Sequence, residues 1–212
     1  MAPEAATHER IYRTIKADLI AGRLHPFRRI DAQAIADQCS ASVTPVREAL
    51  YRLVGETLLE IHHDRGFRVA VPDAESLQQL YGWMEQQLVS CLRLASRPAM
   101  RQAMASLRGR VVAVEDHSFF ALVDDTFEAI AASSENSELL RSVQWGNIRL
   151  SLVRLAEARV FPDLEEEIRK FHRNGGIDVR SNVRARVVSY FRRREKSIKD
   201  VVFNIESSSG NL

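Results

Sequence analysis

Hydrophobic residues recur every three or four positions near the start of the chain, a spacing typical of amphipathic helices. Ile11, Ile15, Leu19 and Ile20 give the first predicted helix an apolar side. Gly22 follows them and is expected to end the helix. Residues 1–7 precede these apolar residues without a pattern of their own, and we expect them to form a short disordered lead.

A second helix and a short turn are predicted next. Pro26 interrupts the chain, and Asp31 is placed to cap a helix that contains Ile35 and Ala36. A turn at 39–41 then separates this helix from a third one. Two helices joined by so short a turn are typical of the helix-turn-helix motif.

The third predicted helix has two different faces. Its apolar stripe consists of Val46, Ala49, Leu50 and Leu53. Val43, Thr44 and Arg47 fall on the other face, where they can reach a partner. Ser42 or Thr44 can cap the first turn, and Pro45 is tolerated there because its missing donor is not needed. A first turn with a hydroxyl, free backbone N–H groups and an arginine suits phosphates and base edges in a DNA groove.

The chain then changes to the alternating pattern of strands. A segment that ends at Ile61 and a second one that starts at Phe67 alternate apolar with polar residues. Gly66 lies between them and is expected to supply the turn of a hairpin. Three helices followed by a hairpin make a winged helix-turn-helix, which we assign to residues 8–71.

The helical spacing returns after Pro72, and Asp73 is placed to cap the first of these helices. Further helical runs are expected at 99–113, 117–132, 137–158, 163–173 and 179–203. No segment of this half alternates as a strand would, so we predict an all-helical bundle for residues 73–212. The predicted fold class is therefore mainly α, with an N-terminal winged helix-turn-helix and a C-terminal all-α helical bundle.

Composition restricts how the chain could bind nucleic acid. Of its 212 residues, 45% are hydrophobic and 27% are charged, as in an ordinary soluble globular protein. The formal net charge at pH 7 is only +2, so no global basic field draws the chain to DNA. We therefore expect DNA binding to depend on a local basic patch that dimerisation duplicates.

The cellular compartment is predicted from cysteine use and from apolar segments. Cys39 and Cys91 are too few for a disulfide framework and suit a reducing cytoplasm. No stretch has the apolar length of a membrane span, and the N-terminus lacks the apolar core of a signal peptide. We expect a cytoplasmic protein without a membrane partner.

The N-terminal third resembles the GntR family of transcriptional regulators. The resemblance is carried by Ile20–Phe27, by Ile30–Ala36, by Ser40–Leu53 with its T-P-V-R-E-A-L sequence, by Leu58-Leu59 and by Gly66. It covers about residues 10–70. The resemblance implies DNA contacts at Gln33, Ser42, Thr44, Arg47 and Gly66.

Two features of this segment affect which operator sequence is recognised, and they do not affect the predicted fold. Val43 stands where family members usually carry an arginine that contacts DNA. A valine cannot pair with guanine, but it can touch a thymine methyl group. The predicted wing adds His63 and Arg65 as DNA-binding candidates, and His63 either approaches phosphate or the minor groove or is simply exposed.

The second half resembles the GntR subfamily whose C-terminal domain is a small helical bundle, the FCD domain. The resemblance rests on Asp124–Glu128 and on the segment 133–140. Members that bind a metal use the aspartate, a histidine four residues later and two further histidines. Here Asp124 is retained but Glu128 replaces the first histidine, so we expect no cofactor and no transition metal. Alternatively, Asp124 and Glu128 hold a hard cation, or they are solvated or paired internally.

Four residues of this half are candidates for binding an effector: Asp124, Glu128, Arg149 and Arg154. The resemblance places the two arginines on a helix that lines the family's ligand cavity, where an arginine could clamp a carboxylate. Pairing with Glu157 or with a neighbouring helix is the competing interpretation. The basic residues at 180–199 are interpreted as the charged outer side of an amphipathic helix rather than as a second nucleic-acid contact.

These observations predict a dimeric transcriptional regulator, a repressor, that responds to a ligand. Its partners would be a double-stranded DNA operator, a second copy of the chain and a small polar or acidic metabolite. The alternative is a constitutive regulator whose helical domain only dimerises. An enzyme is not expected, because the sequence shows no Ser/His/Asp set, glycine-rich phosphate loop or paired-cysteine motif.

Overall fold

The computed structural model describes residues 3–62, 66–107, 117–172 and 178–207. The chain folds as two compact units, one within Met1–Val71 and the other within Pro72–Ser208. Each unit has its own core, and the two are described separately below. None of the described helices is long and apolar enough to cross a membrane.

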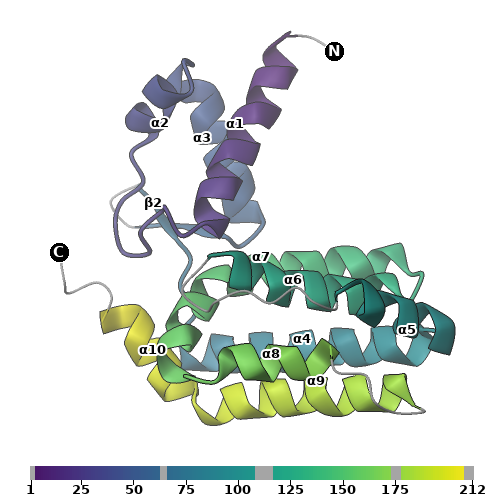
Figure 1. The fold of residues 1–212 in the computed structure, drawn as a ribbon. Helices are drawn as coiled ribbons and strands as arrows, with labels where there is room; N and C mark the ends of the chain where they lie inside the picture. Colours follow the sequence, from purple (N-terminus) through teal and green to yellow (C-terminus); the bar gives the residue numbers. More distant parts are fainter. Residues whose placement is uncertain (1–2, 63–65, 108–116, 173–177, 208–212) are drawn as a thin grey trace. The chain divides into compact units, whose positions relative to one another are not determined.

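The N-terminal unit contains α1 (Pro3–Ile20), α2 (Ala32–Gln38), α3 (Val43–Gly55), β1 (Leu59–Ile61) and β2 (Phe67–Val69) (Figure 1). The expectation of a disordered lead is wrong for residues 3–7, because α1 already begins at Pro3, while residues 1–2 lie outside the described residues. Proline is tolerated in the first turn of a helix, and no glycine interrupts the chain between Pro3 and Ile20. Gly22 follows α1 with a φ of 68°, a left-handed conformation that glycine adopts without strain.

Helix α3 lies at the centre of this unit and contacts α1, α2 and β1. Its buried apolar stripe is the predicted one, formed by Val46, Ala49, Leu50 and Leu53. Asp31 caps α2 as predicted, accepting hydrogen bonds from the backbone N–H groups of Gln33 and Ala34. The turn between α2 and α3 requires a φ of 51° at Ser40. A non-glycine residue is strained in this conformation.

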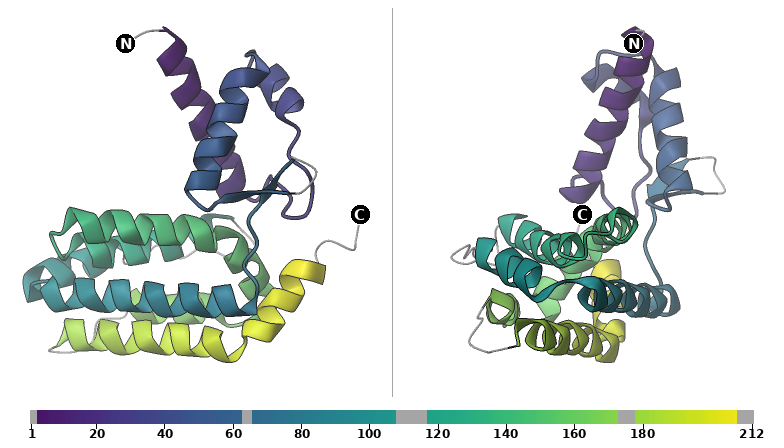
Figure 2. Two further views of the ribbon diagram at one scale, coloured as in Figure 1. Left: turned by 180° about the vertical axis from the view of Figure 1, so that it is seen from behind. Right: turned by 90° about the vertical axis from the view of Figure 1, so that its right-hand side faces the viewer.

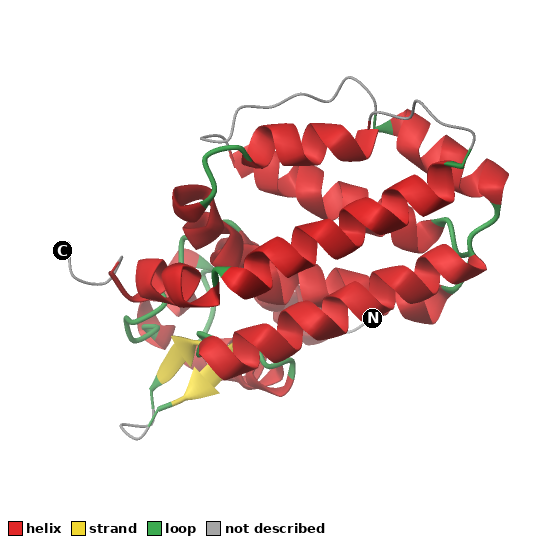
Figure 3. Cartoon of the chain, turned by 90° about the horizontal axis from the view of Figure 1, so that it is seen from below, coloured by secondary structure: helices red, strands yellow, loops and turns green. Residues whose placement is uncertain are grey.

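The hairpin is antiparallel, with Leu59 opposite Val69 and Ile61 opposite Phe67, and its strands are yellow in Figure 3. The backbone N–H of Ile30 donates to the carbonyl of Phe67 at 2.8 Å, which ties the segment before α2 to the hairpin. The fold class predicted for the N-terminal unit, a winged helix-turn-helix, is confirmed.

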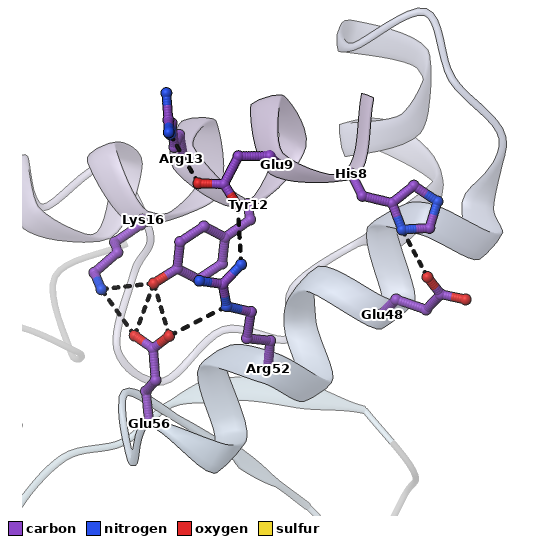
Figure 4. Close-up of polar contacts among 8 residues, drawn as sticks. All are labelled: His8, Glu9, Tyr12, Arg13, Lys16, Glu48, Arg52 and Glu56. Atoms are coloured by element: carbon purple, nitrogen blue, oxygen red, sulfur yellow. Dashed lines mark hydrogen bonds and ion pairs between the residues drawn. The ribbon is translucent and has the colours of Figure 1, made fainter. Parts of the chain in front are cut away.

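Polar contacts join α1 to the end of α3 (Figure 4). The Tyr12 hydroxyl donates to a Glu56 carboxylate oxygen at 2.7 Å, and Lys16 Nζ donates to the other oxygen at 2.8 Å. Arg52 donates to Glu9 at 3.0 Å, and its guanidinium lies over the Tyr12 ring. These contacts hold α3 against α1 and so fix the orientation of its exposed face.

The second unit consists, in its described residues, of α4 (Ala74–Leu94), α5 (Arg97–Ser106), α6 (His117–Ala132), α7 (Ser137–Val160), α8 (Leu164–His172), α9 (Val179–Lys196) and α10 (Ile198–Ser207). The all-helical bundle is therefore confirmed. The run predicted at 179–203 is divided at Ser197 into α9 and α10. The part of the 99–113 run after 107 lies outside the described residues.

Helix α4 is central to the bundle and contacts α6, α7, α9 and α10. The right-hand view of Figure 2 looks nearly along several of these helices. Gly146 allows the close approach of α7 to α4, because a Cβ atom there would lie 2.7 Å from Met84 Sδ and 2.8 Å from Trp83 Cζ3. The core also holds an aromatic cluster in which Phe127 contacts the rings of Tyr190 and Phe191.

Candidate functional site

The first turn of α3 is open to a partner. Ser42 occupies the N-cap position with extended backbone, but its side chain makes no capping hydrogen bond. Of the two residues expected to cap this turn, Ser42 or Thr44, Ser42 therefore does not cap it. Ser42 and Thr44 are exposed. The hydroxyls and the unpaired N–H groups of the turn form the positive end of a helix, which attracts phosphate.

A surface hollow lies beside this turn, between the start of α2, the start of α3 and the start of β2. It is lined by Arg29, Ile30, Asp31, Ala32, Gln33, Val43, Arg47, Gly66 and Phe67. Four of the predicted DNA-binding residues are among them: Gln33, Val43, Arg47 and Gly66. Residues far apart in the sequence therefore present one continuous surface.

A second hollow contains the other two predicted residues of this turn. Ser42 and Thr44 line it together with residues from the start of α1, including His8. His8 Nδ1 lies 2.8 Å from a Glu48 carboxylate oxygen, which links α1 to α3 at this point. The predicted DNA-binding residues thus lie on both sides of the N-terminus of α3. His63 and Arg65 lie outside the described residues.

Arg29 is a residue that sequence reasoning missed. Its side chain lies across Gly66, where an added Cβ atom would be 2.9 Å from Arg29 Nε. A side chain at position 66 would therefore meet the Arg29 side chain, which would have to shift to make room for it. The signal in the sequence was the Arg28-Arg29 pair directly before Ile30. Both arginines are exposed.

Gln33 has a defined orientation at the edge of the first hollow. Its Nε2 donates to Asp37 Oδ1 at 2.8 Å, one turn later on α2. Arg47 is exposed and makes no hydrogen bond or ion pair with any described residue. Arg29 and Arg47 therefore give the hollow two guanidinium groups that can turn toward phosphate or a base edge.

In the helical unit, two of the four effector candidates are brought together. Arg154 donates to the Asp124 carboxylate through Nη1 and to Asn147 Oδ1 through Nη2 at 2.9 Å. Burial raises the pKa of Asp124, and the charge of Arg154 opposes that effect without cancelling it. Burial would lower the pKa of Arg154, but Asp124, Tyr190 and Glu157 together outweigh it and the pKa is raised. Arg154 thus pairs with a neighbouring helix rather than with Glu157.

The other two candidates have different partners. Glu128 accepts a hydrogen bond from Gln144 Nε2 at 3.0 Å. The Arg149 guanidinium lies over the Trp145 ring, 4.8 Å from its centroid. Both side chains are half-buried. Of the four candidates, only Asp124 and Arg154 contact each other, while Glu128 bonds to Gln144 and Arg149 packs on Trp145 of its own helix.

Sequence reasoning also missed a buried polar network beside this pair. Glu157 accepts hydrogen bonds from Arg194 Nε at 2.7 Å and from the Tyr81 hydroxyl at 2.6 Å. Arg194 Nη1 donates to Glu167 at 3.1 Å. Arg194 was assigned to a solvated face, yet only 1% of its side chain is exposed. It faces inward because α9 presents Arg194 one turn after Tyr190, on the buried side.

A metal site needs several ligating side chains close together. No group of three or more His, Cys, Asp or Glu side chains among the described residues meets this requirement. Asp124 has Arg154 as its cationic partner. The side chain of His172, the nearest imidazole in the sequence to the expected ligand positions, lies outside the described residues.

Comparison with known proteins identifies the N-terminal unit. Residues 7–69 match the family described as bacterial regulatory proteins, gntR family. Residues 7–69 therefore form a GntR-type winged helix-turn-helix domain. The winged helix-turn-helix and the residues around α3 belong to this match, and GntR regulators bind DNA operators rather than catalyse reactions.

Two proteins with similar sequences are named as transcriptional regulators. This chain is 29% identical over 154 residues to the Nta operon transcriptional regulator of Aminobacter aminovorans, covering 62% of this chain and 72% of that protein. It is 33% identical over 82 residues to the HTH-type transcriptional repressor GlaR of Escherichia coli strain K12, covering 37% of each.

A solved structure supports the fold of the whole chain. A putative GntR transcriptional regulator from Rhodococcus sp. RHA1 superposes with a TM-score of 0.73 at 19% identity. The superposition covers 91% of this chain and 97% of that one.

Proposed function

We propose that the protein is a dimeric repressor whose two N-terminal units bind the half-sites of a pseudo-palindromic operator. Residues 8–71 form the DNA-binding domain, and residues 73–212 form a helical domain of the FCD type that dimerises and binds an effector. The observation that carries this proposal is the arrangement of two hollows around the start of α3, with Arg29 and Arg47 in one and Ser42 and Thr44 in the other.

The chemistry of each side chain gives it a role at the operator. Arg47 reaches a guanine edge or a phosphate, and Val43 touches a thymine methyl group. Ser42, Thr44 and the free N–H groups of the first turn hold a phosphate. Gln33, at the start of α2, approaches the sugar-phosphate backbone of the DNA. His63 and Arg65, which lie outside the described residues, are proposed as further contacts.

An operator selected from a random DNA pool tests this surface. Arg47→Ala should weaken operator binding by about 1–3 kcal/mol, measured by fluorescence anisotropy at fixed salt. Arg13→Ala is the matched control, because it removes the same charge from an exposed side chain that lines neither hollow. Equal affinity of Arg47→Ala and the parent, with an unchanged melting temperature, would refute the proposed interface.

Dimerisation follows from the small size of the DNA-binding unit. A lone winged domain makes too few phosphate contacts for tight binding at physiological salt. Sedimentation at micromolar concentration should give about twice the chain mass of 24.0 kDa. A monomer at that concentration would remove the proposed architecture.

We propose a small polar or acidic metabolite as the effector. Arg149 or Arg154 would act as the anion clamp, and Asp124 and Glu128 would accept hydrogen bonds from hydroxyl or amino groups. Since Arg154 already pairs with Asp124, an anion bound by Arg154 must take the place of that carboxylate. Arg149 has no carboxylate partner among the described residues and is the more accessible clamp.

A thermal-shift screen with small organic acids separates this proposal from a constitutive dimer. Trp83 and Trp145, both in the helical unit, are the only tryptophans of the chain, so their fluorescence reports on that unit. A ligand that binds only the folded state must raise the melting temperature. A hit that also releases the operator and is lost in Arg149→Gln would support the effector site. The absence of any hit would favour the constitutive alternative.

A further inference from the structure

A groove on the surface of the helical unit is lined by three arginines. It runs between α4 and α9 and is lined by Val89, Leu92, Arg93, Arg180, Ser181 and Arg184. Its volume is about 440 Å³, within the range of small-molecule sites. It lies on different helices from the effector candidates of α6 and α7.

Helical spacing directs the lining residues into the groove from both sides. Val89 and Arg93 are one turn apart on α4, and Arg180 and Arg184 are one turn apart on α9. Since α4 and α9 pack along each other, the three guanidinium groups face a common space. Like charges at this spacing repel, and such a cluster is unfavourable unless an anion neutralises it.

The described residues supply little of that neutralisation. Arg93 and Arg184 make no hydrogen bond or ion pair with any of them, and Arg180 donates only to the carbonyl of Ala95, at 3.3 Å. Glu85, also on α4, is close enough to Arg184 to feel its charge but forms no ion pair with it among these residues. Asp178 caps α9 and accepts the Ser181 hydroxyl at 2.7 Å. This hydrogen bond lowers the pKa of Asp178 and the charge of Arg180 contributes to the lowering, but Asp178 and Arg180 form no ion pair among these residues.

The floor of the groove has a different chemistry from its walls. Val89 and Leu92 line it and are buried, with 4% and 2% of their surfaces exposed. An apolar floor between guanidinium walls fits a molecule with an apolar stem and carboxylate ends, because guanidinium groups pair with carboxylates through two parallel hydrogen bonds. Inorganic phosphate could pair with the guanidinium groups, but it has no apolar part to contact Val89 and Leu92.

We propose that the groove between α4 and α9 binds a small organic acid, with Arg93, Arg180 and Arg184 holding its carboxylates and Val89 and Leu92 contacting its stem. This site does not depend on the effector site proposed between α6 and α7, and each can be tested without the other.

The experiment uses the full chain and linear dicarboxylates from succinate to suberate, with binding measured by calorimetry at constant ionic strength. Saturable binding of at least one dicarboxylate is expected. Hexane-1,6-diol keeps the stem of adipate without its charges, and phosphate keeps charge without a stem. Both should bind at least tenfold more weakly than the best dicarboxylate.

Two variants test whether the ligand binds in this groove, and a third serves as the control. Arg93→Gln and Arg184→Gln alter exposed side chains that make no hydrogen bond or ion pair with the described residues, and each should weaken binding at least tenfold. Arg192→Gln removes the same charge from an exposed position on α9 outside the groove and should bind like the parent.

Three results would overturn the proposal. One is the absence of saturable binding by every dicarboxylate in the series. Another is unchanged affinity in both Arg93→Gln and Arg184→Gln. If Arg149→Gln alone then lost binding, the ligand would be assigned to the effector site proposed between α6 and α7. The third is phosphate binding as tight as that of the best dicarboxylate, which would mean that charge alone is recognised.

Discussion

Arg194 and Glu157 form a buried ion pair in the helical unit, with 2.7 Å between Nε and Oε2 and no more than 2% of either side chain exposed. Burial would lower the pKa of Arg194, but Glu157, Tyr190 and Glu167 outweigh it, so the guanidinium remains charged. Tyr81 and Glu167 complete the hydrogen bonding of the pair. The Arg194 guanidinium therefore joins α9 to α7 and α8, and the Glu157 carboxylate adds α4 through Tyr81.

Arg194→Met should destabilise the helical unit by about 3–5 kcal/mol, because it leaves the Glu157 carboxylate buried without its partner. Urea unfolding followed by tryptophan fluorescence measures this loss. Arg192→Met, at an exposed neighbouring position, should change stability by less than about 0.5 kcal/mol. A loss of under about 1 kcal/mol in Arg194→Met would contradict the burial and pairing described for this residue.

The Glu56 cluster should make the N-terminal unit sensitive to acid. Burial raises the pKa of Glu56, but the hydrogen bonds from Lys16 and Tyr12 outweigh it and the pKa is lowered. A carboxyl with a lowered folded-state pKa stabilises the fold above its unfolded pKa and loses that contribution as the pH falls through the folded value. Glu56→Gln should destabilise α1 and α3 by about 1–2 kcal/mol at pH 7.

Hydrogen-exchange mass spectrometry of the full chain checks this prediction, because it reports on peptides of α1 and α3 separately. The difference between parent and Glu56→Gln should shrink as the pH is lowered below about 4.5. Glu60→Gln changes an exposed carboxylate nearby and should leave the exchange unaltered. A pH-independent difference would mean that the ionised carboxylate is not what stabilises the contact.

Ser40→Gly should stabilise the N-terminal unit. The φ of 51° at Ser40 costs a residue with a Cβ atom about 1–2 kcal/mol, and the greater freedom of glycine in the unfolded chain offsets part of this gain. We expect a net stabilisation of up to about 1 kcal/mol, seen as slower exchange in α2 and α3. Ala41→Gly, at a position without a positive φ, should have the opposite effect. Faster exchange in Ser40→Gly would show that its backbone is not strained.

Val43→Arg should change the preferred operator. Val43 lines the same hollow as Arg29 and Arg47, so an arginine there can reach a base edge and favour guanine over thymine. Selection from a random DNA pool with the parent and the variant measures the change. If both proteins select the same sequences, position 43 does not face the bases.

Purified, chelator-free protein should hold no tightly bound zinc, nickel or manganese. Glu128 replaces an imidazole that such ions favour, and Asp124 is engaged by Arg154. Elemental analysis is the direct measurement. Near-stoichiometric metal would mean that the ligands were misassigned, and it would make His172 a ligand.

Local sequence determined much of the N-terminal unit. The stripe of Val46, Ala49 and Leu50 specifies which face of α3 is buried, and that choice leaves Val43 and Arg47 outside. Alternation on either side of Gly66 specified the hairpin and its facing residues. These features follow from the 3.6-residue and two-residue periods of helices and strands, which a single sequence displays directly.

Only the tertiary structure decided which distant side chains meet. Arg29 lies over Gly66, 37 positions later, because the segment before α2 pairs with the hairpin. Arg154 pairs with Asp124 of α6 and Glu157 pairs with Arg194 of α9, although Arg154 and Glu157 are less than one turn apart on α7. The periodicity of a sequence predicts that a residue faces inward. The partner of a buried charge depends instead on how helices far apart in sequence pack together.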